Sequence, residues 1–221
     1  HSFENFWGFF TDTTRTSSQE LQFDVYRPLT TVSFALTYAI FGANPIPYHL
    51  INIALHAFNV LLVFFLLRRA MGDETKALLA AAIFAVHPAQ TEAVTWITGR
   101  GNVQSVFLML LAMLAYLRGR PWFYVASLIL YVLATLSKES GIVLPALLLA
   151  WQVFVPRDGS AGSWGRITRV APFFGLAVVF VLMRIHFLGQ VGQVPPHGGN
   201  WFTHGLIAIR TIAAYLQMAS W

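Results

Sequence analysis

The sequence contains no cysteine and few charged residues. Of its 221 residues, 10% are charged and none is Cys. A soluble domain carries about 25% charged residues, so these charges are too few to cover the surface of a water-soluble globule. Without cysteine there are no disulfides, thiolate nucleophiles or cysteine-based metal sites. A hydrophobic content of 57% also excludes a disordered chain, which needs low hydrophobicity and high net charge.

Apolar residues are abundant and occur in long segments. The mean hydropathy is +0.62, and 15% of the residues are aromatic. A helix needs about 20 apolar residues to cross the hydrocarbon core of a bilayer, and about seven segments approach this length. We therefore predict an all-α, polytopic transmembrane helix bundle over residues 46–221. Its spans are expected at about 46–67, 77–97, 103–117, 122–137, 141–155, 170–188 and 205–221.

The first 45 residues differ from the rest. Four aromatic residues recur at helical spacing: Phe3, Phe6, Trp7 and Phe10. An aromatic face on a short helix suits the membrane interface. Pro28 then opens a second helix that is expected to reach about Phe41. Three hydroxyl residues share one face of it: Thr30, Ser33 and Thr37. We predict that residues 1–45 form an extramembrane loop with interfacial amphipathic helices.

The net charge of +5 arises from basic residues that gather in alternate loops. They are Arg68, Arg69, Lys76, Arg118, Arg120, Arg157, Arg166 and Arg169. The positive-inside rule makes this side cytoplasmic and places residues 1–45 outside. Because no basic run exceeds two residues, nucleic acid is not an expected partner. We expect an integral protein of a bacterial cytoplasmic membrane rather than of the endoplasmic reticulum, in contact with membrane lipid.

The first predicted span carries a polar stripe. Its members are His49, Asn52, His56 and Asn59. Their spacing of 3, 4 and 3 places them within about 80° of one another around a helix. The stripe either forms hydrogen bonds that pack neighbouring helices or contacts a ligand directly. No carboxylate lies on this face, so no metal site is indicated.

A second group of polar residues lies at span boundaries on the predicted outer side. It comprises Arg27, His87, Glu92, Arg100, Lys138, Glu139 and Arg184. Arg and Lys hold phosphate by charge-assisted hydrogen bonds, and a carboxylate can serve as general base. The simpler interpretation is a belt of solvated or snorkelling charges. Mixed charges at one membrane surface favour a site for a phosphorylated lipid.

Five motifs, in order, resemble one family. They are Tyr26-Arg27-Pro28-Leu29; Tyr48-His49-Leu50-Ile51-Asn52 with His56 and Asn59; His87-Pro88 with Thr91-Glu92-Ala93-Val94; Gly99-Arg100; and Leu136-Ser137-Lys138-Glu139. Their order and spacing resemble the membrane part of the transmembrane and tetratricopeptide-repeat protein O-mannosyltransferases and their bacterial relatives. These belong to the GT-C superfamily of polyprenyl-phosphate-sugar-dependent glycosyltransferases. The resemblance covers roughly residues 1–155, and residues 156–221 match only in hydropathy.

The resemblance implies inverting transfer of a sugar from a polyprenyl-phosphate donor to a protein or glycan acceptor on the outer face. We expect no covalently bound cofactor, and the sequence indicates no divalent metal. The expected phosphate contacts are Arg27, Arg100 and Lys138, and the residues expected to shape the cavity are His87, Glu92 and Glu139. The family's base is an acid in the first extramembrane loop, which we expect upstream of His1. Asp24 is the best substitute within the chain, and Asn102 stands where a further acid is expected.

Two other functions are weighed against the enzyme. The chain begins after the expected base, lacks the repeats and has 7 Trp, 7 Tyr and 19 Phe available for packing. These features favour a non-catalytic accessory subunit that packs against other membrane subunits. A transporter would show interrupted helices in two repeated halves, and the sequence has no such symmetry.

Overall fold

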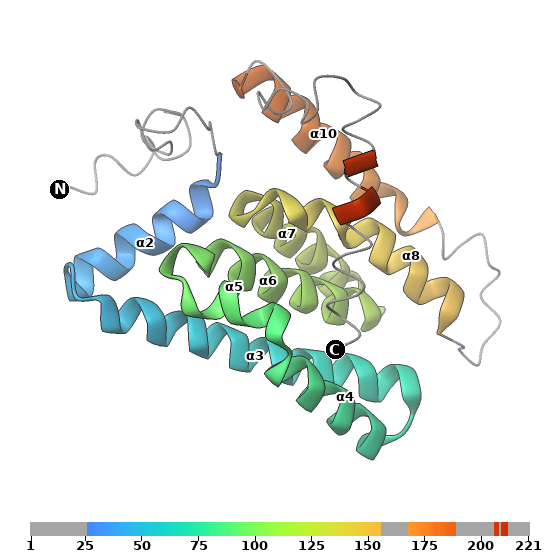
Figure 1. Ribbon diagram of the computed structural model, residues 1–221. Coiled ribbons are helices and arrows are strands. Elements are labelled where there is room, and N and C mark those ends of the chain that lie inside the picture. The colour runs from blue at the N-terminus through green and yellow to red at the C-terminus, as the bar shows by residue number, and fades with distance from the viewer. Residues whose placement is uncertain (1–25, 156–167, 189–205, 208, 212–221) are drawn as a thin grey trace.

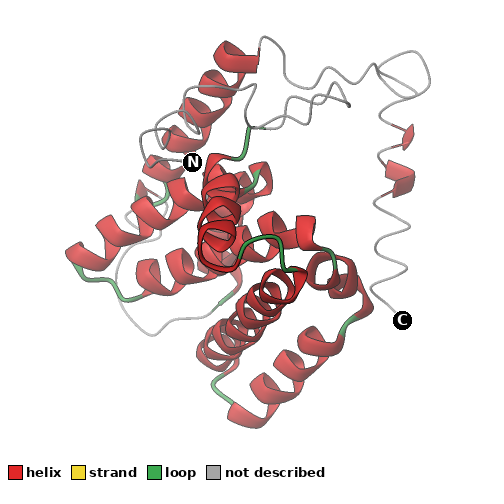
Figure 2. Cartoon of the chain, turned by 90° about the vertical axis from the view of Figure 1, so that its left-hand side faces the viewer, coloured by secondary structure: helices red, strands yellow, loops and turns green. Residues whose placement is uncertain are grey.

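The regular structure of the described residues is entirely helical. The computed structural model describes residues 26–155, 168–188, 206–207 and 209–211. Within these ranges there is no β-strand (Figure 2), so the predicted all-α class is confirmed. The α-helices are α2 (Pro28–Phe41), α3 (Pro45–Met71), α4 (Glu74–Val86), α5 (Thr91–Thr95), α6 (Arg100–Leu117), α7 (Pro121–Ser137), α8 (Leu144–Phe154) and α10 (Ala171–Leu188). The 3-10 helices are η3 (Pro88–Gln90), η4 (Ile97–Gly99) and η5 (Glu139–Val143).

Glycine and capping side chains define the turn between α3 and α4. Gly72 ends α3 in the left-handed conformation (φ 65°), and its N–H donates to the carbonyl of Arg68. Only glycine adopts this conformation without steric cost. Asp73 then accepts a hydrogen bond from the backbone N–H of Lys76 and starts α4. As a result α4 returns beside the C-terminal half of α3, as Figure 1 shows.

Two helical segments in the described ranges are long and apolar enough to cross a membrane. They are Pro45–Met71 and Ile97–Leu117. A third crossing arises if Glu74–Val86 and Pro88–Thr95, bent by 51°, form one span. The other apolar helical segments have 10–17 residues: Pro28–Phe41, Pro121–Ser137, Glu139–Phe154 and Ala171–His186. The total of seven spans stays a prediction, and most of the predicted span 205–221 lies outside the described residues.

The helix expected over residues 77–97 is interrupted. α4 ends at Val86, His87 is extended (ψ 129°), and Pro88 opens η3. Proline removes a backbone donor and clashes with the preceding turn, so the helix cannot continue through it. His87 stabilises the new turn because its Nδ1 accepts a hydrogen bond from the N–H of Ala89 at 3.1 Å. The span predicted over residues 77–97 therefore consists of two helical pieces, and the end or kink that Pro88 predicts from the sequence is confirmed.

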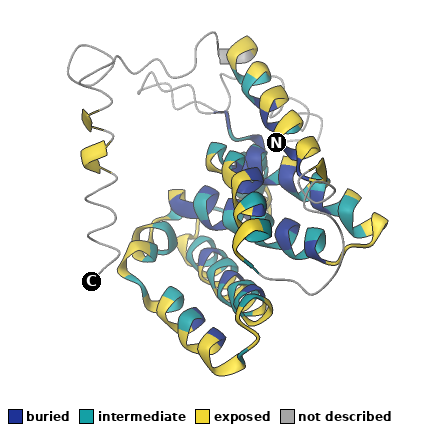
Figure 3. Ribbon diagram, turned by 90° about the vertical axis from the view of Figure 1, so that its right-hand side faces the viewer, coloured by how far each residue is buried: buried dark blue, intermediate teal, exposed yellow. Residues whose placement is uncertain are grey.

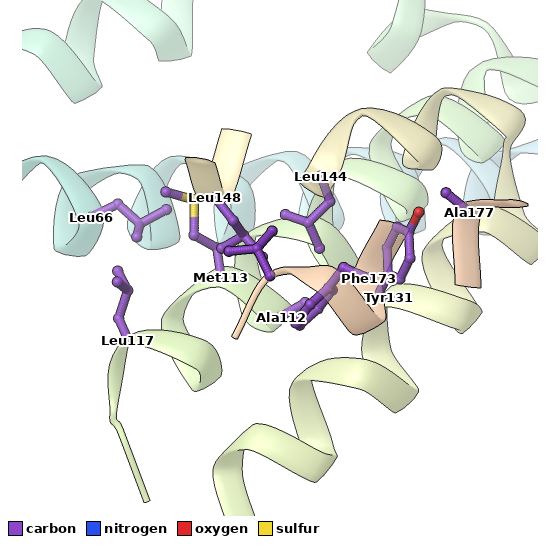
Figure 4. Packing of buried hydrophobic residues seen from close by; sticks show 10 residues of the cluster. Leu66, Ala112, Met113, Leu117, Tyr131, Leu144, Leu148, Phe173 and Ala177 are labelled. Carbon is purple, nitrogen blue, oxygen red and sulfur yellow. The ribbon is translucent and has the colours of Figure 1, made fainter. Parts of the chain in front are cut away.

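The hydrophobic core lies between α3, α6, α7, α8 and α10 (Figure 4). Phe173 of α10 is fully buried, and its ring centroid lies 5.6 Å from that of Tyr131 in α7. Leu144 and Leu148 of α8 are also fully buried. These contacts seat α10 and α8 against the α6–α7 pair, although residues 156–167 between them are not described.

Many residues on the outer faces of the helices are exposed (Figure 3). Many of these exposed residues are large and apolar. Examples are Ile53 at 53% exposure on α3 and Ile83 at 63% on α4. Soluble monomers rarely expose extended apolar surfaces, whereas a bilayer places such side chains against acyl chains. The surface therefore agrees with an integral membrane protein.

Gly141 in η5 allows a close approach to α7. A Cβ at this position would lie 2.8 Å from the carbonyl carbon of Ala134 and 2.9 Å from the backbone nitrogen of Thr135. Both neighbours are backbone atoms, so no rotamer change relieves the contact. The absence of a side chain at Gly141 therefore sets how η5, which begins with Glu139, sits on α7.

We predict that Gly141→Ala destabilises the protein by about 1–3 kcal/mol, the usual cost of overpacking. The matched control is Gly175→Ala in α10, where nothing lies within 4 Å of the added Cβ. Alanine favours an exposed helix by up to about 1 kcal/mol over glycine, so the control is expected to be neutral or stabilising. Thermal unfolding of the detergent-solubilised variants measures both, and equal melting temperatures would contradict the packing assigned to Gly141.

Candidate functional site

Four helix ends converge at one end of the bundle. They are the starts of α2 and α6, the end of α7 and the C-terminal part of α10. They gather five of the residues predicted to bind substrate: Arg27, Arg100, Lys138, Glu139 and Arg184. We refer to Arg27, Lys138, Glu139 and Arg184, with Asn102 beside them, as the Glu139 cluster.

Two guanidinium groups flank the carboxylate of Glu139. Arg27 binds it in bidentate geometry, with Nε 3.0 Å from Oε2 and Nη2 2.7 Å from Oε1. Arg184 Nη1 lies 3.7 Å from Oε2. The Arg27 and Glu139 side chains are 29% and 38% exposed, so the pair is partly shielded from solvent. Bidentate pairs of this kind are stronger and more directional than ordinary surface ion pairs.

The arginines determine the protonation of Glu139. Burial raises its pKa, but the hydrogen bond from Arg27 and the charges of Arg27 and Arg184 outweigh burial, and the pKa falls to about 2. Because this pKa is lowered, the stability that the pair contributes is present above the ordinary value of 4.5 and is lost as pH falls through about 2. At neutral pH Glu139 is therefore a weakly basic carboxylate, which suits ion pairing better than general base catalysis.

Lys138 completes the positive side of the cluster. Its ammonium donates a hydrogen bond to Asn102 Oδ1. Burial is the main cause that lowers the pKa of Lys138, and the charge of Arg27 lowers it further. The charges of Glu139 and of the exposed Glu92 raise it. Asn102 is thus a neutral hydrogen-bond partner of Lys138, and only the charges of Glu139 and Glu92 favour the protonated form. Glu139 thus has two guanidinium partners, Arg27 and Arg184, while Lys138 lies beside them on Asn102.

Arg100 is fully buried next to this cluster. Its guanidinium donates to Asn52 Oδ1 (3.2 Å), Ser33 O (3.3 Å), Ser33 Oγ (3.2 Å), Thr37 Oγ1 (2.7 Å) and Tyr48 O (3.2 Å). It also lies 4.4 Å from the ring centroid of Phe34 and 5.3 Å from that of Tyr48. These partners come from α2 and α3, so Arg100 joins both helices to the start of α6.

The partners of Arg100 explain how a charge can be buried there. An unpaired buried charge costs several kcal/mol. Here hydrogen bonds and two aromatic faces replace the lost water. A phosphate would have to displace these contacts to reach the guanidinium. We therefore treat Arg100 as a positioning residue, and the phosphate contact expected for it stays a prediction.

The polar stripe of α3 makes hydrogen bonds to neighbouring helices. Asn52 Nδ2 donates to the carbonyl of Trp96 at 3.0 Å, and Asn59 Nδ2 donates to that of Val103 at 3.0 Å. His56 Nε2 lies 3.2 Å from the carbonyl oxygen of Ala85. His49 is half-buried. This geometry favours the packing interpretation of the stripe over direct ligand contact.

The other candidate residues are not members of the Glu139 cluster. His87 caps η3 through its ring nitrogen. Asp24 lies outside the described residues, so the structure places no base there. Among the described residues, no group of three His, Asp or Glu side chains could hold a metal ion.

Sequence reasoning identified the hydroxyl face of α2 but not its partner. Ser33 and Thr37 accept from Arg100, and Thr30 Oγ1 donates to the carbonyl of Ser137 at 2.8 Å. Hydroxyl groups along one face of an apolar helix need polar partners, so the stripe itself indicated that a polar group packs against α2. Nothing in the sequence indicated that Phe34 contacts Arg100, because only the tertiary structure brings its ring next to the guanidinium.

We predict that Arg100→Ala lowers the stability of the protein by about 3 kcal/mol or more, because buried acceptors on two helices lose their donor. Arg118→Ala is the control: it removes the same charge at the other end of α6, where the residue is exposed. Its effect is expected within about 0.5 kcal/mol. Thermal unfolding in detergent provides the measurement, and similar losses in both variants would refute the role of Arg100.

Comparison with known proteins gives a family assignment. The family model described as dolichyl-phosphate-mannose-protein mannosyltransferase matches residues 28–187. Mouse protein O-mannosyl-transferase TMTC3 is 36% identical over 161 residues, 69% of this chain and 17% of the relative. Xenopus laevis tmtc2 is 35% identical over 215 residues, 90% of this chain and 25% of the relative. Drosophila Tmtc1 is 41% identical over 128 residues, 56% of this chain and 15% of the relative.

The match to the family model covers more than half of the chain. It includes every residue of the Glu139 cluster except Arg27, which directly precedes it. The chain spans only about a fifth of the length of the curated relatives that it matches. No solved structure matches it significantly. The resemblance found in the motifs is confirmed, and the chain belongs to the dolichyl-phosphate-mannose-protein mannosyltransferase family.

Proposed function

We propose that this chain is part of an integral membrane O-mannosyltransferase, which transfers mannose from a polyprenyl-phosphate donor to a protein acceptor on the non-cytoplasmic face. The family match and the names of the relatives support mannosyl transfer to protein. The Glu139 cluster supports a phosphate-bearing donor. The bacterial cytoplasmic membrane stays a prediction, and the relatives compared here are animal proteins.

The observation that carries the proposal is a carboxylate held between two guanidinium groups. A carboxylate and a phosphate present similar oxygens to arginine, and both accept bidentate hydrogen bonds. The position of Glu139 between Arg27 and Arg184 therefore marks a place that suits an anionic oxygen. We assign this place to the donor phosphate, with Glu139 occupying it while no donor is bound.

Arg184 adds support of its own. Its Nη1 is buried and makes no hydrogen bond with any described group, although Glu139 Oε2 lies 3.7 Å away. A buried donor without an acceptor is costly. A phosphate oxygen at Nη1 would remove that cost.

The cluster would act on the leaving group. In the transfer the acceptor hydroxyl attacks the anomeric carbon, the bond from that carbon to the phosphate oxygen breaks, and the phosphate leaves with the electron pair. Arg27, Arg184 and Lys138 would stabilise the charge that develops on the phosphate. The hydroxyl proton goes to a base, the role expected of an acid in the first loop. Arg100 would act indirectly, by holding α2 and with it Arg27.

The test is binding of farnesyl phosphate, a short polyprenyl phosphate, to the full-length protein in detergent. Arg184→Ala is expected to weaken binding at least about tenfold, because a charge-assisted hydrogen bond is lost. Glu139→Gln is expected to strengthen binding by about threefold or more, because the competing charge is removed while the shape of the side chain is kept. Glu92→Gln removes a nearby carboxylate that holds neither arginine, and a smaller change is expected.

Different results separate the parts of the proposal. If Arg184→Ala binds as well as the wild type, the cluster is not the phosphate site. If Glu139→Gln binds no better, Glu139 does not occupy the phosphate position. Mannose transfer from a polyprenyl-phosphate-mannose donor by the full-length wild type tests the activity itself. Its absence, together with stoichiometric copurification with other membrane proteins, would favour an accessory subunit.

A further inference from the structure

The opposite end of the bundle contains a cavity that the proposed transfer reaction does not use. It has a volume of about 410 Å³ and lies between the start of α7 and the residues that precede α10. Its lining residues are Pro121, Tyr124, Val125, Thr168 and Arg169. This end carries the basic residues that the sequence predicts to be cytoplasmic.

Tyr124 fixes the wall of this cavity. Its hydroxyl donates a hydrogen bond to the backbone carbonyl of Arg169 at 3.0 Å. Its ring packs edge-on against Phe173, with centroids 6.1 Å apart and planes at 81°. Because Phe173 is fully buried in the core, the backbone of Arg169 is tied to a rigid part of the bundle.

Positive charge gathers around the cavity without acidic partners. Arg118, Arg120 and Arg169 are all exposed there. The acidic residues described at this end are engaged elsewhere, because Asp73 pairs with Lys76 at 3.2 Å and Glu74 with Arg68 at 3.6 Å. Within the described ranges, no carboxylate forms an ion pair with any of the three arginines.

An exposed apolar stripe leads away from the cavity along α7. Trp122 is 80% exposed, Val125 48%, Ile129 57% and Val132 37%. Their spacing of 3, 4 and 3 places them on one face of the helix. Val125 belongs both to the stripe and to the cavity wall. The cavity, which Arg169 lines, is thus continuous with the apolar stripe on the exposed face of α7.

We propose that this cavity binds the headgroup of an anionic phospholipid, with one acyl chain lying along the stripe. Arg169 lines the cavity and would contact the phosphate, while Arg118 and Arg120 contribute long-range attraction. Basic recesses between transmembrane helices bind acidic headgroups in this way. The apolar track distinguishes a lipid from a free phosphate, which would use the cavity alone. The proposal does not depend on the transferase activity.

Native mass spectrometry of the intact protein in detergent, titrated with phosphatidylglycerol or phosphatidylcholine, tests the site. The wild type is expected to retain phosphatidylglycerol preferentially. Arg169→Ala is expected to lower that retention about fivefold, the effect of losing one basic residue at a charged membrane surface. Arg68→Ala is the matched control, because it removes an exposed arginine at the same end but outside the cavity, and less than a twofold change is expected.

Three results would overturn the proposal. The first is equal retention of the two lipids by the wild type. The second is an equal loss in Arg68→Ala and Arg169→Ala, which would indicate a general effect of charge. The third is displacement of the bound lipid by millimolar inorganic phosphate, which would indicate a site for free phosphate. Unchanged melting temperatures in both variants show that any loss of lipid does not come from unfolding.

Discussion

The end of the bundle that contains the Glu139 cluster depends on one constraint. The guanidinium of Arg100 must be buried there without losing its hydrogen-bond partners. Backbone and side-chain oxygens from two helices accept its hydrogen bonds, and two aromatic rings lie beside it. A buried charge is tolerated only with such a complete set of partners. The cost of leaving it unpaired therefore requires α2, α3 and α6 to meet in one geometry. That geometry places Arg27, at the start of α2, within reach of Glu139.

The Glu139 cluster follows from this constraint and has the opposite character. Arg100 is enclosed and its donors are used within the chain, whereas the Arg27–Glu139 pair is partly exposed and Arg184 Nη1 has no hydrogen-bond partner among the described groups. The hydrogen bonds of Arg100 are all used to join helices, whereas a partly exposed ion pair and a donor without a hydrogen-bond partner can take up a ligand in place of a protein group. The distinction separates a positioning arginine from arginines suited to bind a phosphate.

The two proposed anion sites, at opposite ends of the bundle, differ in kind. At one end, two guanidinium groups flank a carboxylate, which the proposed donor phosphate would replace. At the other, arginines without acidic partners border a cavity that continues into an apolar track. Both depend on the core contact of Phe173 with Tyr131, because this contact seats α10 against α7 and thereby places Arg184 and Arg169 at opposite ends.

The sequence by itself determined the helical class, the helix from Pro28 to Phe41 and the group of charged residues that gather at one end. Low charge and long apolar segments allow few other folds, and alternating helix direction brings alternate loops to the same side. Pro88 already predicts that the helix ends or kinks at His87-Pro88, and the structure confirms it. Nothing in the sequence, however, indicated which arginine is buried. That feature depends on contacts between residues far apart in the chain, such as Arg100 with Ser33 and Thr37. Periodicity records which face of a helix is polar, but only tertiary packing decides which partner meets it.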